Sequence, residues 1–184
     1  MKRVILVHGL NGYPQEGWHP WLIRELENRQ VKVINPAMPN PHSPKQRYWV
    51  SKLQEVVGNP DENTFLIGHS LGCITILRYL ESLHGSQRIG GVILLAGFTD
   101  DLDIQELKDF FRKDINWEEI KKHCGRLISI HSDDDPVVPL EYGNIFKEKL
   151  NAEEITEHEK KHFSGDDDIY ELPILLEKLT ELLR

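Results

Sequence analysis

The sequence predicts an α/β protein, specifically a three-layer α/β/α sandwich with about six mainly parallel strands. Two observations predict this class. Short apolar, β-branched runs recur along the chain, and stretches with helical spacing separate them. Nearly continuous apolar runs are typical of parallel strands that are buried on both faces. Regular alternation of strand and helix indicates βαβ units, which place helices on both faces of the sheet.

Five runs have the length and composition of buried strands, and a sixth is weaker. The strong runs are residues 4–7, 31–34, 64–67, 92–95 and 127–130. The weaker run, 154–157, alternates polar and apolar residues, which favours a strand at the edge of the sheet.

Helical spacing of apolar residues fills the intervals between these runs. The expected helices are one that follows Pro20, then 48–57, 71–83, 104–111, 117–120, 142–150 and 172–183. The segment 36–44 contains four prolines and is predicted to be a stiff loop beside a sheet edge.

The chain has 184 residues, 39% of them hydrophobic, and a formal net charge of −8. This length is typical of one domain, so we expect residues 1–184 to form a single domain with a proper core. The acidic balance argues against nucleic acid or an anionic membrane as a partner, because both require clustered Lys and Arg. No apolar run approaches a membrane span or a signal-peptide core. The two cysteines make no disulfide framework, and we expect a soluble cytoplasmic protein.

A serine stands at the junction of a predicted strand and a predicted helix. Gly68-His69-Ser70-Leu71-Gly72 matches the pattern Gly-x-Ser-x-Gly, in which a tight strand–helix turn exposes the serine hydroxyl. Flanking glycines tolerate the strained backbone, and the helix N-terminus favours developing negative charge. The alternative is an ordinary turn with a solvated serine, which the strand–turn–helix context makes less favourable.

Two backbone N–H groups are candidates for binding a substrate oxyanion. One is the N–H of Leu71, which directly follows the serine. The other should come from the loop after the first strand, His8–Gly12, where we expect the N–H of Leu10, or otherwise that of Asn11. An ordinary glycine-rich turn is the alternative for this loop.

A serine nucleophile needs a base, and the base needs an acid that orients it. Three aspartates, Asp133, Asp134 and Asp135, follow the strand 127–130. We favour Asp135 because Pro136 fixes the turn after it. The other two fit caps of that turn or solvated positions, and a solvated acidic loop is the alternative for the whole run.

Only two histidines follow these aspartates, as the chain order Ser–acid–His requires. His158 lies in a charged stretch that fits a solvated strand end, whereas His162 lies in a loop before the last helix. We therefore favour His162 as the base. For the others, packing hydrogen bonds are expected for His8, His69 and His131, and surface positions for His19, His42, His84 and His123.

The candidates for lining a substrate pocket are Asn11, Trp18 and His69. Trp18 closely follows the first loop and could line an acyl pocket. The alternative for the two tryptophans is that they pack the first helix onto the sheet, which we favour for Trp21. Neither of the carboxylate-rich segments, 133–135 and 165–168, follows calcium-loop spacing. The histidines and cysteines show no zinc spacing. We expect no metal and no cofactor.

Several segments together carry a family resemblance. They are Val7-His8-Gly9, Trp18 to Leu22, Met38 to Pro41, Gly68 to Gly72, Asp134 to Pro139, and His162-Phe163. They resemble the α/β-hydrolase superfamily, and within it the small serine hydrolases of the YdeN and retinoblastoma-binding-protein-9 type.

The resemblance implies a compact α/β-hydrolase fold with little or no lid. It also implies that Ser70 is the nucleophile, Asp135 the orienting acid and His162 the general base. Only the segment 98–124 is long enough to form a cap, and it is too short for a large lid. One position departs from the pattern: many relatives have a glycine before the histidine, where this chain has Lys161.

The expected function is that of a serine hydrolase of the carboxylesterase type, cleaving small acyl esters through an acyl-enzyme. Two alternatives remain: a non-catalytic protein-binding module on the same fold, or an amidase or acyltransferase that uses the same three residues. The expected partner is a small acyl substrate, and no sequence feature supports a protein partner.

Overall fold

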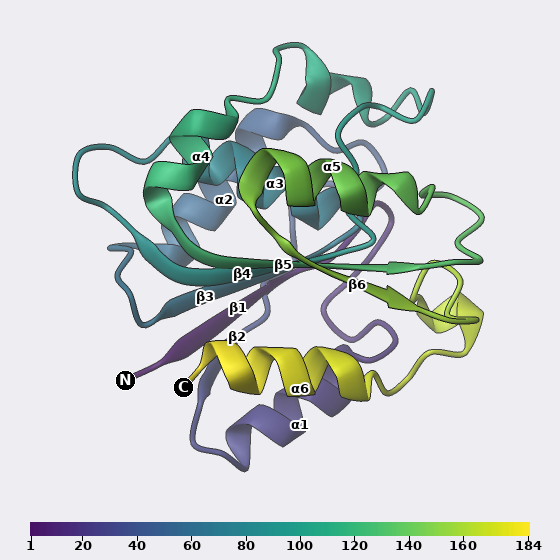
Figure 1. The fold of residues 1–184 in the computed structure, drawn as a ribbon, viewed down its shortest axis with the longest axis horizontal. Helices are drawn as coiled ribbons and strands as arrows, with labels where there is room; N and C mark the ends of the chain where they lie inside the picture. The colour runs from purple at the N-terminus through teal and green to yellow at the C-terminus, as the bar shows by residue number, and fades with distance from the viewer.

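A computed structural model describes residues 1–184 and contains one six-stranded sheet (Figure 1). The strands are β1 (Arg3–Val7), β2 (Lys32–Ile34), β3 (Thr64–His69), β4 (Ile89–Leu95), β5 (Cys124–Ser132) and β6 (Glu153–Glu157). Their order is β2-β1-β3-β4-β5-β6, and every neighbouring pair is parallel. The structure confirms the predicted strands and the edge position of β6.

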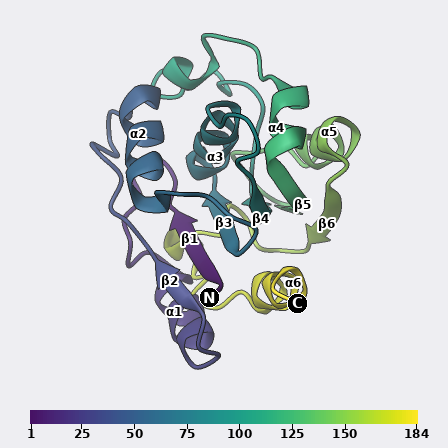
Figure 2. The same ribbon diagram turned by 90° about the vertical axis from the view of Figure 1, so that its left-hand side faces the viewer.

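Helices cover both faces of the sheet. They are α1 (His19–Glu27), α2 (Gln46–Val57), α3 (Leu71–Glu81), α4 (Trp117–His123), α5 (Glu141–Leu150) and α6 (Pro173–Leu182), with short 3₁₀ turns η1 (Lys108–Phe111) and η2 (Gly165–Asp167). Figures 1 and 2 show α1 and α6 on one face and α2 to α5 on the other. This is the three-layer arrangement that the alternation predicted.

The strand order reverses direction between β1 and β3. The chain first moves outward from β1 to β2, and it then returns to place β3 on the other side of β1. Ligands of open α/β sheets bind at such a switch point, beyond the carboxyl ends of the strands, because the two connections diverge there and leave a crevice. The loops that follow Val7 and His69 therefore flank the expected site.

Each layer of helices has its own hydrophobic core. The cluster under α2 to α5 has 29 buried residues and the one under α1 and α6 has 17, so the α2–α5 face is the more heavily packed. Helix α3 is central to the larger core, with every residue from Leu71 to Leu80 buried. A helix with apolar residues on most of its circumference is typical of such a position. The end of α3 that bears the site thus starts from a densely packed part of the core.

The helix predicted over 104–111 is wrong in its first half, since only the 3₁₀ turn η1 is helical there. Side chains compete with the backbone just before it. The Asp100 carboxylate accepts a hydrogen bond from the N–H of Leu102, and Asp101 accepts one from Asp103. Such Asx turns offer the backbone an alternative to the helix, and Leu102 and Asp103 both have positive φ.

A buried arginine fastens the segment 98–124 to α3. Arg78 is 5% exposed, and its guanidinium donates to the carbonyl oxygens of Phe110, Lys113 and Asp114. It also pairs with Glu81 at 2.9 Å. Charge-assisted hydrogen bonds of this kind are stronger than neutral ones. The segment is therefore tied down against the helix layer.

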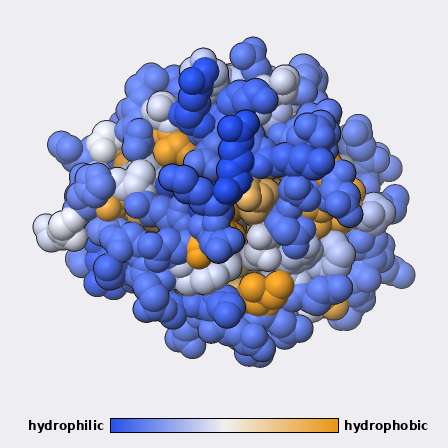
Figure 3. Space-filling view, turned by 90° about the horizontal axis from the view of Figure 1, so that it is seen from above, coloured by the Kyte–Doolittle hydropathy of each residue, from blue (hydrophilic) through white to orange (hydrophobic).

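The surface carries no extended apolar face in the view from above. Figure 3 shows it mostly hydrophilic, with hydrophobic side chains in small separate patches. Single exposed apolar residues of this kind are normal for a protein surface. None of the helices combines the length and the apolar character that crossing a bilayer requires.

Replacing Arg78 with Met should lower the free energy of unfolding by about 2–4 kcal/mol. The substitution keeps the stem but leaves buried carbonyls, and Glu81, without their donor. Urea unfolding would measure the change. The exposed Arg88→Met is the matched control, expected to stay within about 0.5 kcal/mol of wild type. Equal stability of both variants would contradict the role of Arg78 in fastening the segment.

Candidate active site

Ser70 occupies a strained turn between β3 and α3. Its backbone has φ 54° and ψ −118°, a conformation that non-glycine residues rarely adopt. The N–H of Ser70 donates to the carbonyl of Leu95 at 2.9 Å, and its carbonyl accepts from Cys73 N–H at 2.9 Å. These bonds on both sides hold the turn in place.

The two glycines of the pattern are required by close contacts. A Cβ on Gly72 would lie 2.1 Å from the carbonyl oxygen of Val7, which ends β1. A Cβ on Gly68 would lie 2.7 Å from the backbone nitrogen of Cys73. Neither backbone atom can move away cheaply, so only glycine allows α3 to start this close to β1 and β3.

Ser70, His162 and Asp135 form a continuous hydrogen-bond chain. The Oγ of Ser70 lies 3.0 Å from Nε2 of His162, and Nδ1 of His162 lies 2.9 Å from Oδ2 of Asp135. The carboxylate is the partner that fixes the tautomer: Nδ1–H donates to it, and Nε2 is left to accept from the serine hydroxyl. The side chain of Asp135 is 1% exposed and that of His162 is 17% exposed.

The three aspartates after β5 have different partners. Only Asp135 contacts His162, and its Oδ1 also accepts from the N–H groups of Val137 and Val138 at 2.8 and 3.0 Å. Asp134 accepts from the N–H of Lys161 at 2.8 Å, and Asp133 pairs with His158 at 2.5 Å. The latter two therefore hold the loop that leads to His162. His158 itself is exposed and has no hydrogen bond to the serine turn.

The loop around His162 is strained and anchored on several sides. Lys161 and Phe163 have φ of 47° and 56°, so Lys161 adopts the left-handed conformation that favours glycine. Oδ2 of Asp167 accepts from the N–H of His162 at 3.1 Å. His69 Nε2–H donates to the carbonyl of His162 at 2.8 Å, and Trp18 Nε1–H to that of Phe163 at 3.1 Å.

One of the two candidate N–H groups in the first loop is already engaged. The N–H of Asn11 donates to the carbonyl of Pro41 at 2.9 Å, whereas the N–H of Leu10 has no backbone acceptor. Leu71 is the first residue of α3, so its N–H has no partner in the helical ladder. Leu10 and Leu71 thus remain as the two free donors beside Ser70.

The proline-rich segment supports this first loop. The Nδ1–H of His8 donates to the carbonyl of Gly9 at 2.9 Å, and its Nε2 accepts from the N–H of Met38 at 3.0 Å. The Asn11 side chain meets His42 at 2.7 Å. The loop is therefore held from outside by residues that follow β2.

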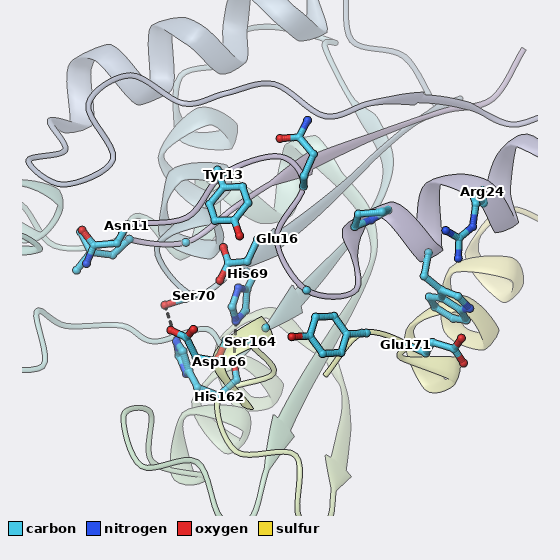
Figure 4. A pocket seen from close by; sticks show the side chains of 18 residues that line it. Asn11, Tyr13, Glu16, Arg24, His69, Ser70, His162, Ser164, Asp166 and Glu171 are labelled. Atoms are coloured by element: carbon cyan, nitrogen blue, oxygen red, sulfur yellow. Dashed lines mark hydrogen bonds between the residues drawn. The ribbon is translucent and has the colours of Figure 1, made fainter. Parts of the chain in front are cut away.

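A cavity of about 640 Å³ opens above Ser70 (Figure 4). The loop after β1, the start of α1, the serine turn and the segment 162–171 line it, and most of the lining residues have polar side chains. The lining residues from the predicted set are Leu10, Asn11, His69, Ser70 and His162. No residue of the segment 98–124 lines it, so that segment is not a lid over the site.

The predicted pocket role of Trp18 is wrong. Trp18 is 2% exposed, packs in the core under α1 and α6, and does not line the cavity. The half-buried Trp21 lines it instead. Trp18 directly precedes α1 and Trp21 lies in its first turn, so only the docking of this segment decides which of the two indoles reaches the cavity.

Sequence reasoning missed several residues at this site, of which Asp167, Glu16 and Tyr170 are examples. Asp167 had a readable signal, because Ser164 and Asp167 form a capping box around η2. Glu16 and Tyr170, both lining the cavity, had none, since a single polar or aromatic residue in a loop carries no pattern. Nowhere do three or more His, Cys, Asp or Glu side chains converge as a set able to hold a metal ion.

Comparison with known proteins identifies relatives of the whole chain. The family model described as Serine hydrolase matches residues 4–181. YdeN of Bacillus subtilis (strain 168), described as a putative hydrolase, is 32% identical over 97% of this chain and 95% of its own length. Its crystal structure superposes with a TM-score of 0.94, covering 99% of this chain and 98% of that chain.

Two further matches are more distant. The serine hydrolase RBBP9 of Rattus norvegicus is 26% identical over 90% of this chain and 89% of its own length. A structure from a study of carboxylesterases of Nitrososphaera gargenis is 12% identical, with a TM-score of 0.74 over 98% of this chain and 90% of that chain. At this identity the second match shows the fold alone.

Five histidines are buried around the site and the core. Burial lowers the pKa of His8, His69 and His131, and it lowers the pKa of His19 to about 4. His8, His69 and His131 form the expected packing hydrogen bonds. The surface prediction for His19 and His123 is wrong, since both are 2% exposed.

These pKa shifts predict loss of stability in mild acid. Below about pH 6.5 the unfolded chain protonates its histidines while the buried ones stay neutral, so stability falls as the pH drops. For His19 the loss between pH 7 and pH 5 should be about 2 kcal/mol. Urea unfolding at the two pH values measures it. His19→Gln should reduce this pH dependence and the exposed His84→Gln should not; an unchanged pH dependence in His19→Gln would contradict the assignment.

Proposed function

This chain belongs to the serine hydrolase family, and on that premise we propose that it is a carboxylesterase that cleaves small acyl esters. The observation that carries the proposal is the hydrogen-bond chain from Ser70 through His162 to Asp135. A serine, a base in contact with it and a buried acid behind the base are the groups that acyl transfer requires.

In the first half-reaction, Ser70 Oγ attacks the ester carbonyl carbon while His162 Nε2 accepts the hydroxyl proton. The carbonyl oxygen gains negative charge, and the free N–H groups of Leu71 and Leu10 donate to it. Collapse of the tetrahedral intermediate breaks the bond to the alcohol oxygen. That oxygen takes the proton from His162, and the acyl group stays on Ser70.

In the second half-reaction, water attacks the acyl carbon and gives a proton to His162. The new tetrahedral intermediate collapses, the carboxylic acid leaves, and Ser70 Oγ regains its proton from His162. Asp135 stays ionised throughout. It orients the imidazole through Nδ1–H and stabilises the imidazolium that forms twice in each cycle.

Two features support an ester substrate of modest size. The cavity is open and polar, and no lid segment covers it, which suits small esters better than long lipids. The fold is also that of the structure from the study of Nitrososphaera gargenis carboxylesterases. Amide cleavage and acyl transfer use the same residues, so a panel of esters, thioesters and amides tests the ester preference directly.

A fluorophosphonate probe should label the native protein at Ser70, because only an activated serine reacts with it readily. Ser70→Ala should abolish the labelling, and the exposed Ser51→Ala should leave it intact. Mass spectrometry of the labelled peptide identifies the site. A folded wild-type protein that stays unlabelled would contradict the enzyme and favour the protein-binding module.

Asp135→Asn should lower kcat for a small 4-nitrophenyl ester by about 10³–10⁴-fold, because the amide no longer fixes the productive imidazole tautomer. Asp133→Asn, the same change two residues away on an exposed carboxylate, should have a far smaller effect. Steady-state kinetics measures both. Similar losses in the two variants would overturn the assignment of Asp135 as the orienting acid.

A further inference from the structure

The cavity above Ser70 contains a carboxylate without a side-chain partner. Glu16 is half-buried, lines the cavity together with Ser70 and His162, and forms no ion pair and no hydrogen bond with another side chain. Its Oε2 lies 2.7 Å from the position that a Cβ on Gly12 would occupy, next to the oxyanion loop. The carboxylate therefore lies within the substrate-binding space.

The surroundings of Glu16 disfavour its charge. Burial raises the pKa of Glu16 and the neighbouring carboxylate of Asp166 adds to the rise, while a hydrogen bond from the backbone of Tyr13 and the charge of His162 offset part of it. A partly desolvated anion beside a second anion is stabilised when a cation binds between or against them. A positively charged ligand bound in the cavity would therefore stabilise the Glu16 carboxylate.

A third acceptor belongs to His69, which is 4% exposed and lines the same cavity. Its Nε2–H donates to the carbonyl of His162, so Nδ1 carries a lone pair. Burial holds the pKa of His69 well below its usual value, which keeps the ring neutral. Nδ1 has no protein donor and can accept a hydrogen bond from a ligand.

Aromatic side chains line the same space. Tyr13 and Tyr170 are 56% and 57% exposed, and Trp21 is half-buried in the cavity wall. The faces of such rings attract cations. Carboxylates combined with aromatic faces are the groups that recognise ammonium ions.

The one cationic side chain of the cavity lies apart from Glu16 and His69. Arg24 is the only Lys or Arg that lines the cavity, and its side chain is exposed. Figure 4 shows Arg24 and Glu171 at the end of the cavity away from Ser70, while Glu16 lies at the same end as Ser70, His69 and His162. The part of the cavity nearest the nucleophile is therefore anionic and rich in acceptors.

We propose that the natural substrate is an ester that carries a protonated amine, and that Glu16 is the residue that selects it, with Asp166 and His69 as further acceptors. This inference rests on the proposed esterase function of the same site. The amine belongs either to the acyl group or to the alcohol, since both parts of an ester lie in this cavity during acylation.

Two matched pairs of esters distinguish an amine on the acyl group from an amine on the alcohol. For the acyl side, 4-nitrophenyl 6-aminohexanoate is compared with 4-nitrophenyl heptanoate; for the alcohol side, 6-aminohexyl acetate is compared with heptyl acetate. Each pair differs by an ammonium in place of a terminal methyl. In one of the pairs the wild type should prefer the amine by about tenfold in kcat/KM, and the preference should shrink with added salt.

Glu16→Gln should bring that ratio close to one. The ratio is the readout because any general loss of activity in the variant affects both members of a pair equally. Glu27→Gln, an exposed glutamate of α1 outside the cavity, should keep the wild-type ratio. A wild type without amine preference in either pair, or a Glu16→Gln variant that retains the preference, would overturn the inference.

These outcomes differ from failure of the proposed function. If the wild type hydrolyses the neutral esters without amine preference, the esterase stands and the role of Glu16 falls. If it hydrolyses none of the four esters and the fluorophosphonate leaves Ser70 unlabelled, the esterase falls, and the inference falls with it.

Discussion

The contact between the start of α3 and the end of β1 is the constraint on which the site depends. The carbonyl oxygen of Val7 would lie 2.1 Å from a Cβ at Gly72, so the helix approaches the strand as closely as a backbone allows. This approach leaves Ser70 on a turn with positive φ, and it places the N–H of Leu71 at the same edge of the sheet as the loop that carries Leu10. Because β1 and β3 are neighbours at the switch point, Ser70 and both free N–H groups follow adjacent strands.

The histidine loop is attached to this rigid centre from several directions. His69 precedes Ser70 in the chain and donates to the carbonyl of His162, so one turn positions both Ser70 and His162. Asp167 holds the N–H of His162, and Trp18 holds the next carbonyl along. Positive φ at Lys161 costs free energy, which these hydrogen bonds offset. The Lys161 departure from the glycine of many relatives therefore leaves the Ser70–His162 contact intact.

Electrostatics connects the reaction to the walls of the cavity. In the proposed mechanism His162 gains a proton in each half-reaction, and its side chain lies near enough to Glu16 for their charges to interact. An anionic wall beside a transient imidazolium stabilises that state, and the same wall attracts a cationic ligand. Since the segment 98–124 is tied to α3 by Arg78 and does not cover the cavity, these charges act in an open and partly solvated site.

The sequence by itself determined the layers, the strands and the participants in the hydrogen-bond chain. Apolar runs predict buried strands because burial on both faces leaves no room for polar residues. The Gly-x-Ser-x-Gly pattern and the chain order of acid and base predict a meeting of Ser70, Asp135 and His162, since parallel strands bring their carboxyl ends to one edge. Their hydrogen-bonded geometry in the structure agrees with that expectation.

Only the tertiary structure decided which neighbouring residues reach the cavity. Trp18, directly before α1, is buried in the core, whereas Trp21 in the first turn of α1 lines the cavity. The sequence does not show which of these two neighbouring indoles the docking of the segment turns toward the site. The same holds for three features of the loops: Asn11 N–H donates to Pro41, His162 N–H donates to Asp167, and Glu16 has no side-chain partner. Each depends on how the loops lie in space, which no local sequence pattern encodes. Periodicity specifies faces and strand ends, whereas contacts between loops follow only from the packing of the whole chain.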